Sequence, residues 1–162
     1  MKVSRILAPV DFSEVSQESL DAAASLASQL GASVVVLHVV EPVYFAGTMF
    51  GPEINVPHLA EEQRRAAKSA METMLARLAK KGVPATGLVE TGIPQDTILN
   101  AASSKKCDLI VMGTHGRSGV THLLLGSVAE KIVRSSTCPV LTVRSTAKPK
   151  KVASKAKPAK KR

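Results

Sequence analysis

The sequence predicts an α/β fold in which a parallel β-sheet is covered by helices on both faces. Short apolar segments rich in β-branched residues alternate with longer segments of helical periodicity, the pattern of repeated strand–helix units. One strand-like segment, Ser33–Val40, is nearly continuous Val and Leu, which is typical of a strand buried on both faces. The length of 162 residues fits one domain.

The first half of the chain contains two predicted strands and one helix. Val3–Ala8 is an apolar strand that Pro9 cuts off, and Ser33–Val40 is the second strand. Between them, Ser13–Leu30 carries Leu and Ala at helical spacing, and Gly31 is its expected end. Residues 41–57, with prolines, glycines and aromatic residues, predict an exposed loop that could act as a mobile lid.

The second half repeats the alternation. A helix is expected from His58 to Lys81, where Gly82 follows, and a second helix begins at Pro94, a residue suited to a first helical position. The other predicted elements are the strands Ala85–Glu90, Asp108–Met112 and Val140–Val143 and the helix Ser127–Arg134.

The positive charge of the chain is concentrated at its C-terminus. The net charge is +9, but residues 147–162 hold eight Lys and Arg residues and no acid, so 14 basic and 13 acidic residues remain in 1–146. We therefore expect a nearly neutral domain, 1–146, and a disordered basic tail, 147–162. The tail either only solubilises the protein or binds nucleic acid or another acidic partner through salt-sensitive contacts.

Cysteine content and hydropathy indicate a reducing, soluble setting. Cys107 and Cys138 fit no zinc spacing and are expected to be reduced and largely buried. We expect no signal peptide, no membrane segment and a cytoplasmic location, because the apolar segments are too short. Aromatic residues make up 2% of the chain, which argues against a stacking platform for single-stranded nucleic acid.

The segment from Gly113 to Ser127 carries the strongest chemical signal. It is rich in glycine, follows the strand that ends at Met112 and precedes a helix. Glycines permit positive φ and close approach of main-chain N–H groups, and a helix N-terminus attracts anions, so the segment predicts a phosphate cradle. It matches neither the Walker A motif nor the dinucleotide fingerprint. From spacing alone, a set of simple turns is an equally good interpretation.

The spacing Gly113-x2-Gly116-x9-Gly126-Ser127 resembles the ATP-binding signature of the universal stress protein family, G-x2-G-x9-G-[S/T]. The resemblance covers about residues 1–145. It implies a Rossmann-like, adenine nucleotide alpha hydrolase-like sheet with strand order 3-2-1-4-5 and an ATP site at the carboxyl ends of strands one and four. The further matching segments, in family order, are Ile6–Ser13, Leu37–Val39, Asp108–Gly116, Ser127–Val133 and Cys138–Val143.

The resemblance also assigns roles to residues on the ribose and adenine side. Asp11, in the turn with Pro9 and Val10, would accept hydrogen bonds from ribose hydroxyls; its alternative role is to cap the next helix, which Ser13 could also do. Val39 would contact adenine through its main chain and side chain, although its side chain is equally well explained as core.

On the phosphate side, backbone and hydroxyl donors would hold the ligand, with Met112 at the end of the preceding strand. Arg117 could donate to phosphate or be an ordinary surface arginine. His115 lies in the same segment and is included among the candidate binding residues. His38, on an apolar strand, is expected to be a satisfied core histidine. The expected phosphate-binding residues are Gly113, Gly116, Gly126, Ser127 and Val128.

The function most consistent with these residues is ATP binding with little or slow hydrolysis. Ser127 could join a Mg²⁺ or Mn²⁺ ion, but no acidic partner for it stands out, and phosphoryl transfer needs one. A slow ATPase or phosphatase-type enzyme on the same fold, and a nucleic-acid-associated protein acting through the tail, are the alternatives. Resemblance to the family further implies a homodimer through the apolar edge strand Val140–Val143.

Overall fold

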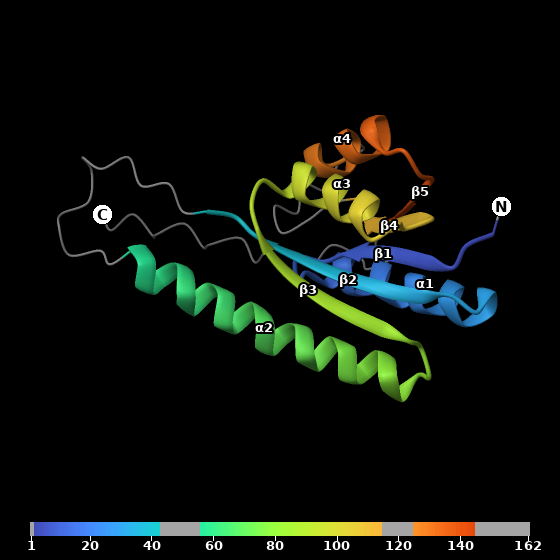
Figure 1. Ribbon diagram of the computed structural model, residues 1–162, viewed down its shortest axis with the longest axis horizontal. Coiled ribbons are helices and arrows are strands. Elements are labelled where there is room, and N and C mark those ends of the chain that lie inside the picture. The colour runs from blue at the N-terminus through green and yellow to red at the C-terminus, as the bar shows by residue number, and fades with distance from the viewer. Residues whose placement is uncertain (1, 43–55, 115–124, 145–162) are drawn as a thin grey trace, which may run out of the picture.

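The computed structural model describes residues 2–42, 56–114 and 125–144. Five parallel strands form one sheet in the order β3-β2-β1-β4-β5 (Figure 1), as expected. The strands are β1 (Arg5–Pro9), β2 (Ser33–Val40), β3 (Ala85–Thr91), β4 (Leu109–Gly113) and β5 (Val140–Val143). The helices are α1 (Glu14–Leu30), α2 (Val56–Lys80), α3 (Pro94–Ser104) and α4 (Ser127–Ser135).

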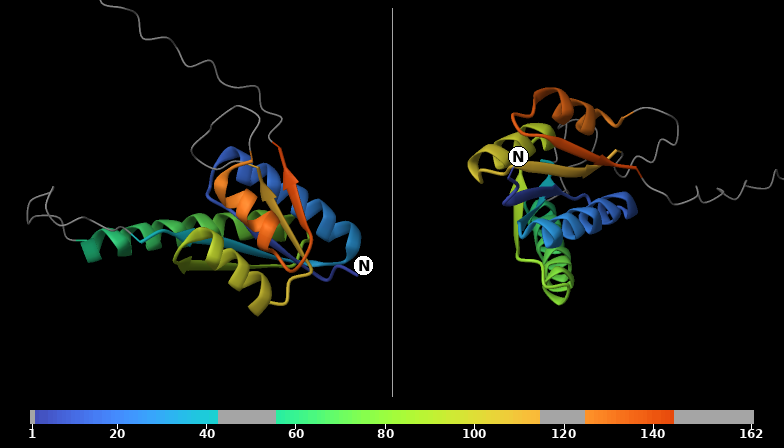
Figure 2. Two further views of the ribbon diagram at one scale, coloured as in Figure 1. Left: turned by 90° about the horizontal axis from the view of Figure 1, so that it is seen from above. Right: turned by 90° about the vertical axis from the view of Figure 1, so that its right-hand side faces the viewer.

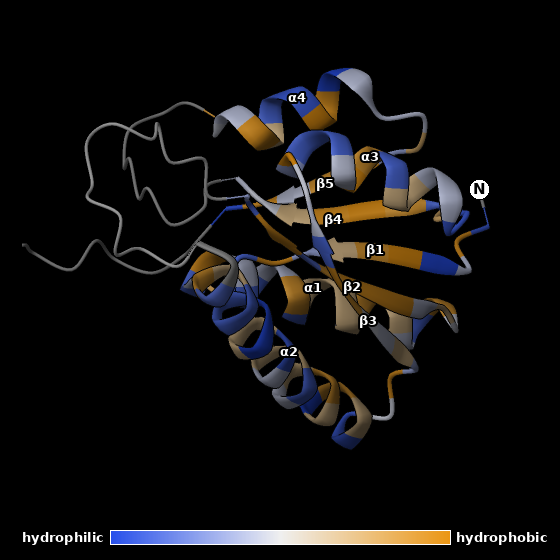
Figure 3. Cartoon of the chain, turned by 60° about the vertical axis from the view of Figure 1, so that its left-hand side comes forward, coloured by the Kyte–Doolittle hydropathy of each residue, from blue (hydrophilic) through white to orange (hydrophobic). Residues whose placement is uncertain are grey.

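Helices cover both faces of the sheet. Alternate residues of β1 point to opposite faces, so Ile6 joins a core with α1 and α2, whereas Leu7 joins a second core with α3 and α4. Figure 2 shows the strands passing between these two helix pairs. In Figure 3 the central strands β1 and β4 are mostly apolar, as strands buried on both faces must be.

Side-chain contacts explain where two elements begin. The main-chain N–H groups of Ser4 and Arg5 donate to Oδ2 of Asp108 at 2.8 and 2.9 Å. The N–H of Ser4 is therefore bound by a side chain, and β1 begins at Arg5 and not at Val3. Helix α1 begins after Ser13, whose Oγ accepts from the N–H of Ser16 at 3.2 Å, an ordinary N-cap.

Helix α2 packs closely against β3 at a glycine. A Cβ atom placed on Gly87 would lie 2.6 Å from Cγ of Met71 and 2.9 Å from Cδ1 of Leu75. These distances are shorter than any normal carbon–carbon contact. The missing side chain at Gly87 therefore allows the helix to approach this edge strand.

The predictions for the loop, the tail, the cysteines and membrane segments have different outcomes. Residues 43–55 of the predicted loop and the whole tail lie outside the described residues, so the lid and the tail stay predictions. Cys107 is buried and Cys138 is partly buried, and both are free thiols. No helix in the described parts is long and apolar enough to span a membrane.

Candidate functional site

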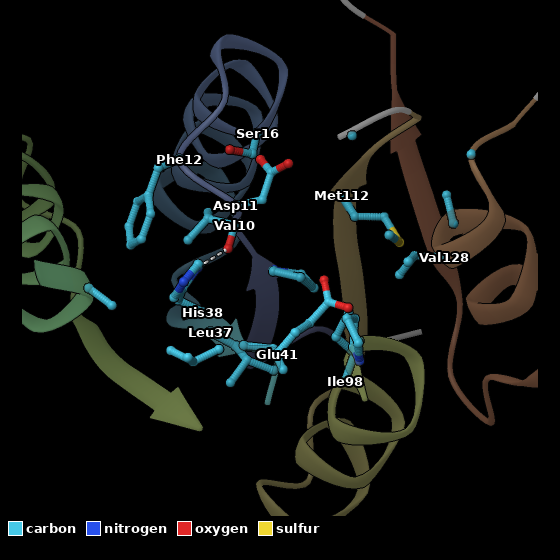
Figure 4. Close-up of a pocket in the computed structure, with 18 of the residues that line it drawn as sticks. Val10, Asp11, Phe12, Ser16, Leu37, His38, Glu41, Ile98, Met112 and Val128 are labelled. Carbon is cyan, nitrogen blue, oxygen red and sulfur yellow. Dashed lines mark hydrogen bonds between the residues drawn. The ribbon is translucent and has the colours of Figure 1, made fainter. Parts of the chain in front are cut away.

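A cavity of about 830 Å³ opens at the carboxyl ends of β1, β2 and β4. Strands β1 and β4 are neighbours, but the chain runs on from β1 to β2 and from β4 to β5, toward opposite edges of the sheet. The connections therefore diverge above the pair and leave a crevice, the usual ligand position in open parallel sheets. Figure 4 shows Val10 and Asp11 on one side of this cavity and Met112 and Val128 on the other.

The turn after β1 holds the carboxylate of Asp11 beside the cavity. Oδ1 of Asp11 accepts hydrogen bonds from the N–H of Ser13 at 3.0 Å and from its Oγ at 2.5 Å. Ser13 is the helix cap, so Asp11 supports the capping residue and does not replace it. The structure thus decides between the two residues that the sequence offered as caps.

The second wall is formed by the ends of the glycine-rich segment. The N–H of Gly126 donates to the carbonyl of Thr114 at 2.8 Å, and the N–H of Thr114 donates to the carbonyl of Val143 at 3.0 Å. These bonds fix both ends of the segment against the sheet. The first turn of α4 consequently begins at the cavity, where Gly126, Ser127, Val128 and Ala129 line it.

The N-terminus of α4 has donors to offer. The first N–H groups of any helix have no partner within the helix. Helix α1 satisfies one of them with the Ser13 side chain, but the N-cap of α4 is Gly126, and among the described residues no side chain caps this helix. The positive end of the helix dipole therefore faces the cavity and favours an anion there.

The expected reason for glycine in this segment is wrong for Gly126. Its φ is −59° and its ψ is 150°, an extended conformation that any residue adopts. Gly113 is a regular residue of β4. Among the glycines of the described residues, positive φ occurs at Gly31 and Gly82, where helices end. What Gly126 provides is therefore a main chain without a side chain at the cavity.

Apolar side chains cover the floor of the cavity between these two polar walls. Val39 is half-buried and packs against the core beneath α3 and α4, together with Met112 and Ile98. The Val39 side chain is thus a core residue that also lines the cavity, and its contact with adenine stays a prediction. A ligand with one apolar end and one anionic end would match this arrangement.

Nine of the twelve predicted site residues line this one cavity. The other three, His115, Gly116 and Arg117, lie outside the described residues. The nine are Pro9, Val10, Asp11, Val39, Met112, Gly113, Gly126, Ser127 and Val128. What each of them binds stays a prediction.

Several residues that line the cavity were not predicted as site residues from the sequence. Among them are Phe12, His38 and Glu41 and the α2 residues Gln63 and Ala66. Glu41 directly follows β2, so its place beyond a strand end was a usable signal. Gln63 and Ala66 carry no such signal, because only the packing of α2 brings them to the cavity.

Titratable groups away from the cavity have displaced pKa values. Burial raises the pKa of the Cys107 thiol to about 11. Main-chain hydrogen bonds from Ser4 and Arg5 lower the pKa of Asp108. Both residues precede β4, whereas the cavity lies beyond its other end. No cluster of three or more His, Cys, Asp or Glu side chains that could hold a metal ion occurs within the described ranges.

Comparisons with known proteins agree on one family. The profile of the universal stress protein family matches residues 2–144. The universal stress protein YxiE of Bacillus subtilis is 36% identical over 146 residues, which cover 87% of this chain and 99% of YxiE.

Solved structures show the same fold. Universal stress protein UspA from Lactobacillus plantarum has a TM-score of 0.78 at 26% identity, covering 89% of this chain and 99% of that one. A universal stress protein from Archaeoglobus fulgidus in complex with dAMP has a TM-score of 0.61 at 23% identity, covering 88% and 98%. The chain therefore belongs to the universal stress protein family.

Proposed function

We propose that this protein binds ATP in the cavity between β1 and β4 and acts as a regulatory nucleotide-binding protein with little or slow hydrolysis. The observation that carries the proposal is the position of Asp11 on one wall and of the N-terminus of α4 on the other. A carboxylate suits ribose hydroxyls, and main-chain N–H groups at a helix N-terminus suit phosphate.

The size and lining of the cavity support this proposal. Its volume of about 830 Å³ lies in the usual range for small-molecule sites, roughly 300–1,000 Å³. The apolar floor near Val39 and Ile98 would accept the adenine ring, and Gly113, Gly126, Ser127 and Val128 would hold the phosphates. The Archaeoglobus fulgidus structure with dAMP indicates that the fold can hold an adenine nucleotide.

The acids at the cavity favour binding over rapid turnover. Asp11 and Glu41 are the acidic residues in the described lining. Oδ1 of Asp11 already accepts two hydrogen bonds from Ser13, which makes Asp11 a poor general base. If Mg²⁺ or Mn²⁺ accompanies the triphosphate, Ser127 is the residue that we expect to approach it.

The direct test is mass spectrometry of nucleotide released from the purified protein, with calorimetric titration of ATP. Gly126→Val should fold, because valine readily adopts the extended conformation of residue 126, but its side chain should block the phosphates. We expect ATP affinity to fall by about tenfold or more. Ser127→Ala should weaken binding several-fold, whereas Ser135→Ala, at the other end of α4, is the matched control and should bind normally.

Different outcomes separate the alternatives. Intact ATP that co-purifies with the protein supports ATP binding with little or slow hydrolysis. Steady multiple-turnover release of phosphate that Asp11→Ala abolishes would instead establish the enzyme. A folded protein without measurable affinity for any adenosine phosphate, with or without Mg²⁺ or Mn²⁺, would overturn the proposal.

We also propose that the protein forms a homodimer through β5. This strand is at the edge of the sheet and exposes Leu141, which is 41% accessible, and unpaired apolar edges favour pairing with another chain. Leu141→Lys should shift the protein from dimer to monomer in analytical ultracentrifugation. A wild-type protein that is monomeric at tens of micromolar (about where a micromolar dimer forms) would contradict this.

For residues 147–162 we propose a separate role outside the nucleotide-binding domain, 1–146. Its eight positive charges and lack of acids fit salt-sensitive binding to nucleic acid. Deleting 147–162 should abolish DNA binding at low salt without changing ATP affinity. DNA binding that survives the deletion would exclude the tail as its cause.

A further inference from the structure

The turn between β1 and α1 contains an aromatic residue in left-handed backbone. Phe12 has a φ of 65°, a region that bulky side chains rarely adopt and that surrounding contacts must therefore maintain. Asp11 directly precedes it and lines the cavity. The conformation of this turn consequently sets the direction in which the Asp11 carboxylate enters the cavity.

Strand β2 contacts this turn through the side chain of His38. The imidazole is 8% exposed, and its Nδ1 lies 2.8 Å from the carbonyl oxygen of Val10. Because a carbonyl oxygen only accepts hydrogen bonds, Nδ1 carries the proton. The N–H of Val10 also donates to the carbonyl of Leu37 at 2.8 Å, so β2 binds both polar groups of the Val10 main chain.

The same imidazole contacts the strained residue itself. The ring centroids of Phe12 and His38 are 4.2 Å apart, with an angle of 32° between the ring planes. In Figure 4 the Phe12 ring lies beside His38, and a dashed line marks the hydrogen bond from His38 to Val10. His38 therefore contacts the residues on both sides of Asp11.

We propose that His38 is a positioning residue for the nucleotide: by binding Val10 and stacking on Phe12 it fixes the carboxylate of Asp11 for the ribose hydroxyls. This inference rests on the proposed function. A buried histidine on β2, outside the phosphate segment, thus controls recognition of the sugar.

If residue 38 only packed in the core, its side chain would need only a suitable volume. An aliphatic side chain such as leucine would fill similar space, but it could neither donate to the Val10 carbonyl nor form the ring contact. Asparagine places an N–H donor near the position of Nδ1 but has no ring. These two substitutions therefore separate filled volume from the hydrogen bond.

The experiment compares the dissociation constants of ATP and 2′,3′-dideoxy-ATP, which lacks both ribose hydroxyls, by calorimetry on the full chain. If Asp11 binds these hydroxyls, the wild-type protein should prefer ATP by about 10- to 150-fold, the range for hydrogen bonds to a charged group. Asp11→Ala should bring this ratio close to one.

His38→Leu should lower the ratio about threefold or more, and adding it to Asp11→Ala should cause no further change, because both act on the same contact. His38→Asn should recover part of the preference. Phe12→Leu, which removes the ring contact at a half-buried position, should lower the ratio as well and provides a second variant if His38→Leu does not fold.

The control for general loss of stability is Val83→Ala, a buried site between α2 and β3 at the opposite end of the sheet; its ratio should equal that of wild type. A wild-type ratio in folded His38→Leu, or in Phe12→Leu if His38→Leu does not fold, overturns the inference while leaving ATP binding intact. Failure of the wild-type protein to bind ATP overturns the proposed function and this inference together.

Discussion

Asp108 joins the start of β1 to the start of β4, and its charge state should affect folding. Its pKa is lowered because main-chain N–H groups of Ser4 and Arg5 donate to the carboxylate. A group with a depressed pKa in the folded protein stabilises it above the ordinary value of 3.8 and loses this effect as the pH falls.

We therefore expect the urea midpoint of the wild-type protein to decrease more steeply than that of Asp108→Asn below about pH 4. At neutral pH the variant should be less stable, because its amide replaces a charged acceptor. Circular dichroism between pH 3 and 7 measures both. Parallel curves for the two proteins over this range would exclude the proposed contribution.

The Cys107 thiol should be chemically inert in the folded protein. Burial raises its pKa to about 11, and the thiolate is the form that reacts, so at pH 8 roughly one thiol in a thousand is ionised. We expect iodoacetamide to leave Cys107 unmodified in native Cys138→Ser and to modify it in urea. Mass spectrometry gives the result, and equal labelling rates in both states would contradict it.

Resemblance to the family identified nine residues that line the cavity but not how the protein holds them. Gly126 stood out because the family signature contains it, and Asp11 because Ile6–Ser13 resembles the start of the family's sequence. The left-handed conformation of Phe12 could not be predicted, since sequence reading expects glycine or asparagine at such a position. His38 was correctly expected to be a satisfied, buried histidine, but only the fold identifies its partner as the Val10 carbonyl.

At the scale of elements, the sequence pattern predicted each strand and helix of the described residues, and the differences lie at their ends. Ser33–Val40 was predicted with the observed bounds, because its nearly continuous apolar sequence follows the helix end at Gly31 and stops at Glu41. Helix α2 begins at Val56 and not at His58. The glycine at position 87 was not recognised as a packing site, because the sequence does not show which residues of α2 lie against which residues of β3.

Gly87→Val should destabilise the protein by about 1–3 kcal/mol, the usual cost of overpacking. Its side chain would collide with Met71 and Leu75 of α2. The free energy of unfolding in urea measures the effect. Gly87→Ala, with one added carbon, should cost less.

A compensating variant tests the mechanism. Met71→Ala removes the side chain nearest to the added atoms and should be destabilising alone. Combined with Gly87→Val, it should cost at least about 1 kcal/mol less than the two single changes together. Strict additivity would show that the destabilisation arises elsewhere.

For the whole molecule, alternation of strands and helices predicted a parallel sheet but not the order of its strands. The order 3-2-1-4-5 followed from resemblance to the family, because local periodicity does not say on which side of β1 the chain places β4. This order creates the crevice, so the position of the site could not have been predicted from periodicity alone.

Ligand binding at the crevice should stabilise the entire domain, since its walls come from every layer of the fold. At an ATP concentration of 100 times the dissociation constant, the gain is about 2.7 kcal/mol, or an increase in Tm of roughly 5–10 °C for a domain of this size. Differential scanning fluorimetry should show this increase for wild type and little for Gly126→Val. Equal shifts in both would place the ligand elsewhere.

The hydrogen bond between Gly126 and Thr114 has an evolutionary consequence. It closes the base of the segment between them, and Thr114 is in turn bonded to Val143 at the end of β5. The sheet and α4 are thus joined independently of what the intervening residues are. Substitutions between these anchors, at an unchanged segment length, should therefore alter ligand contacts among relatives without requiring the scaffold to fold anew.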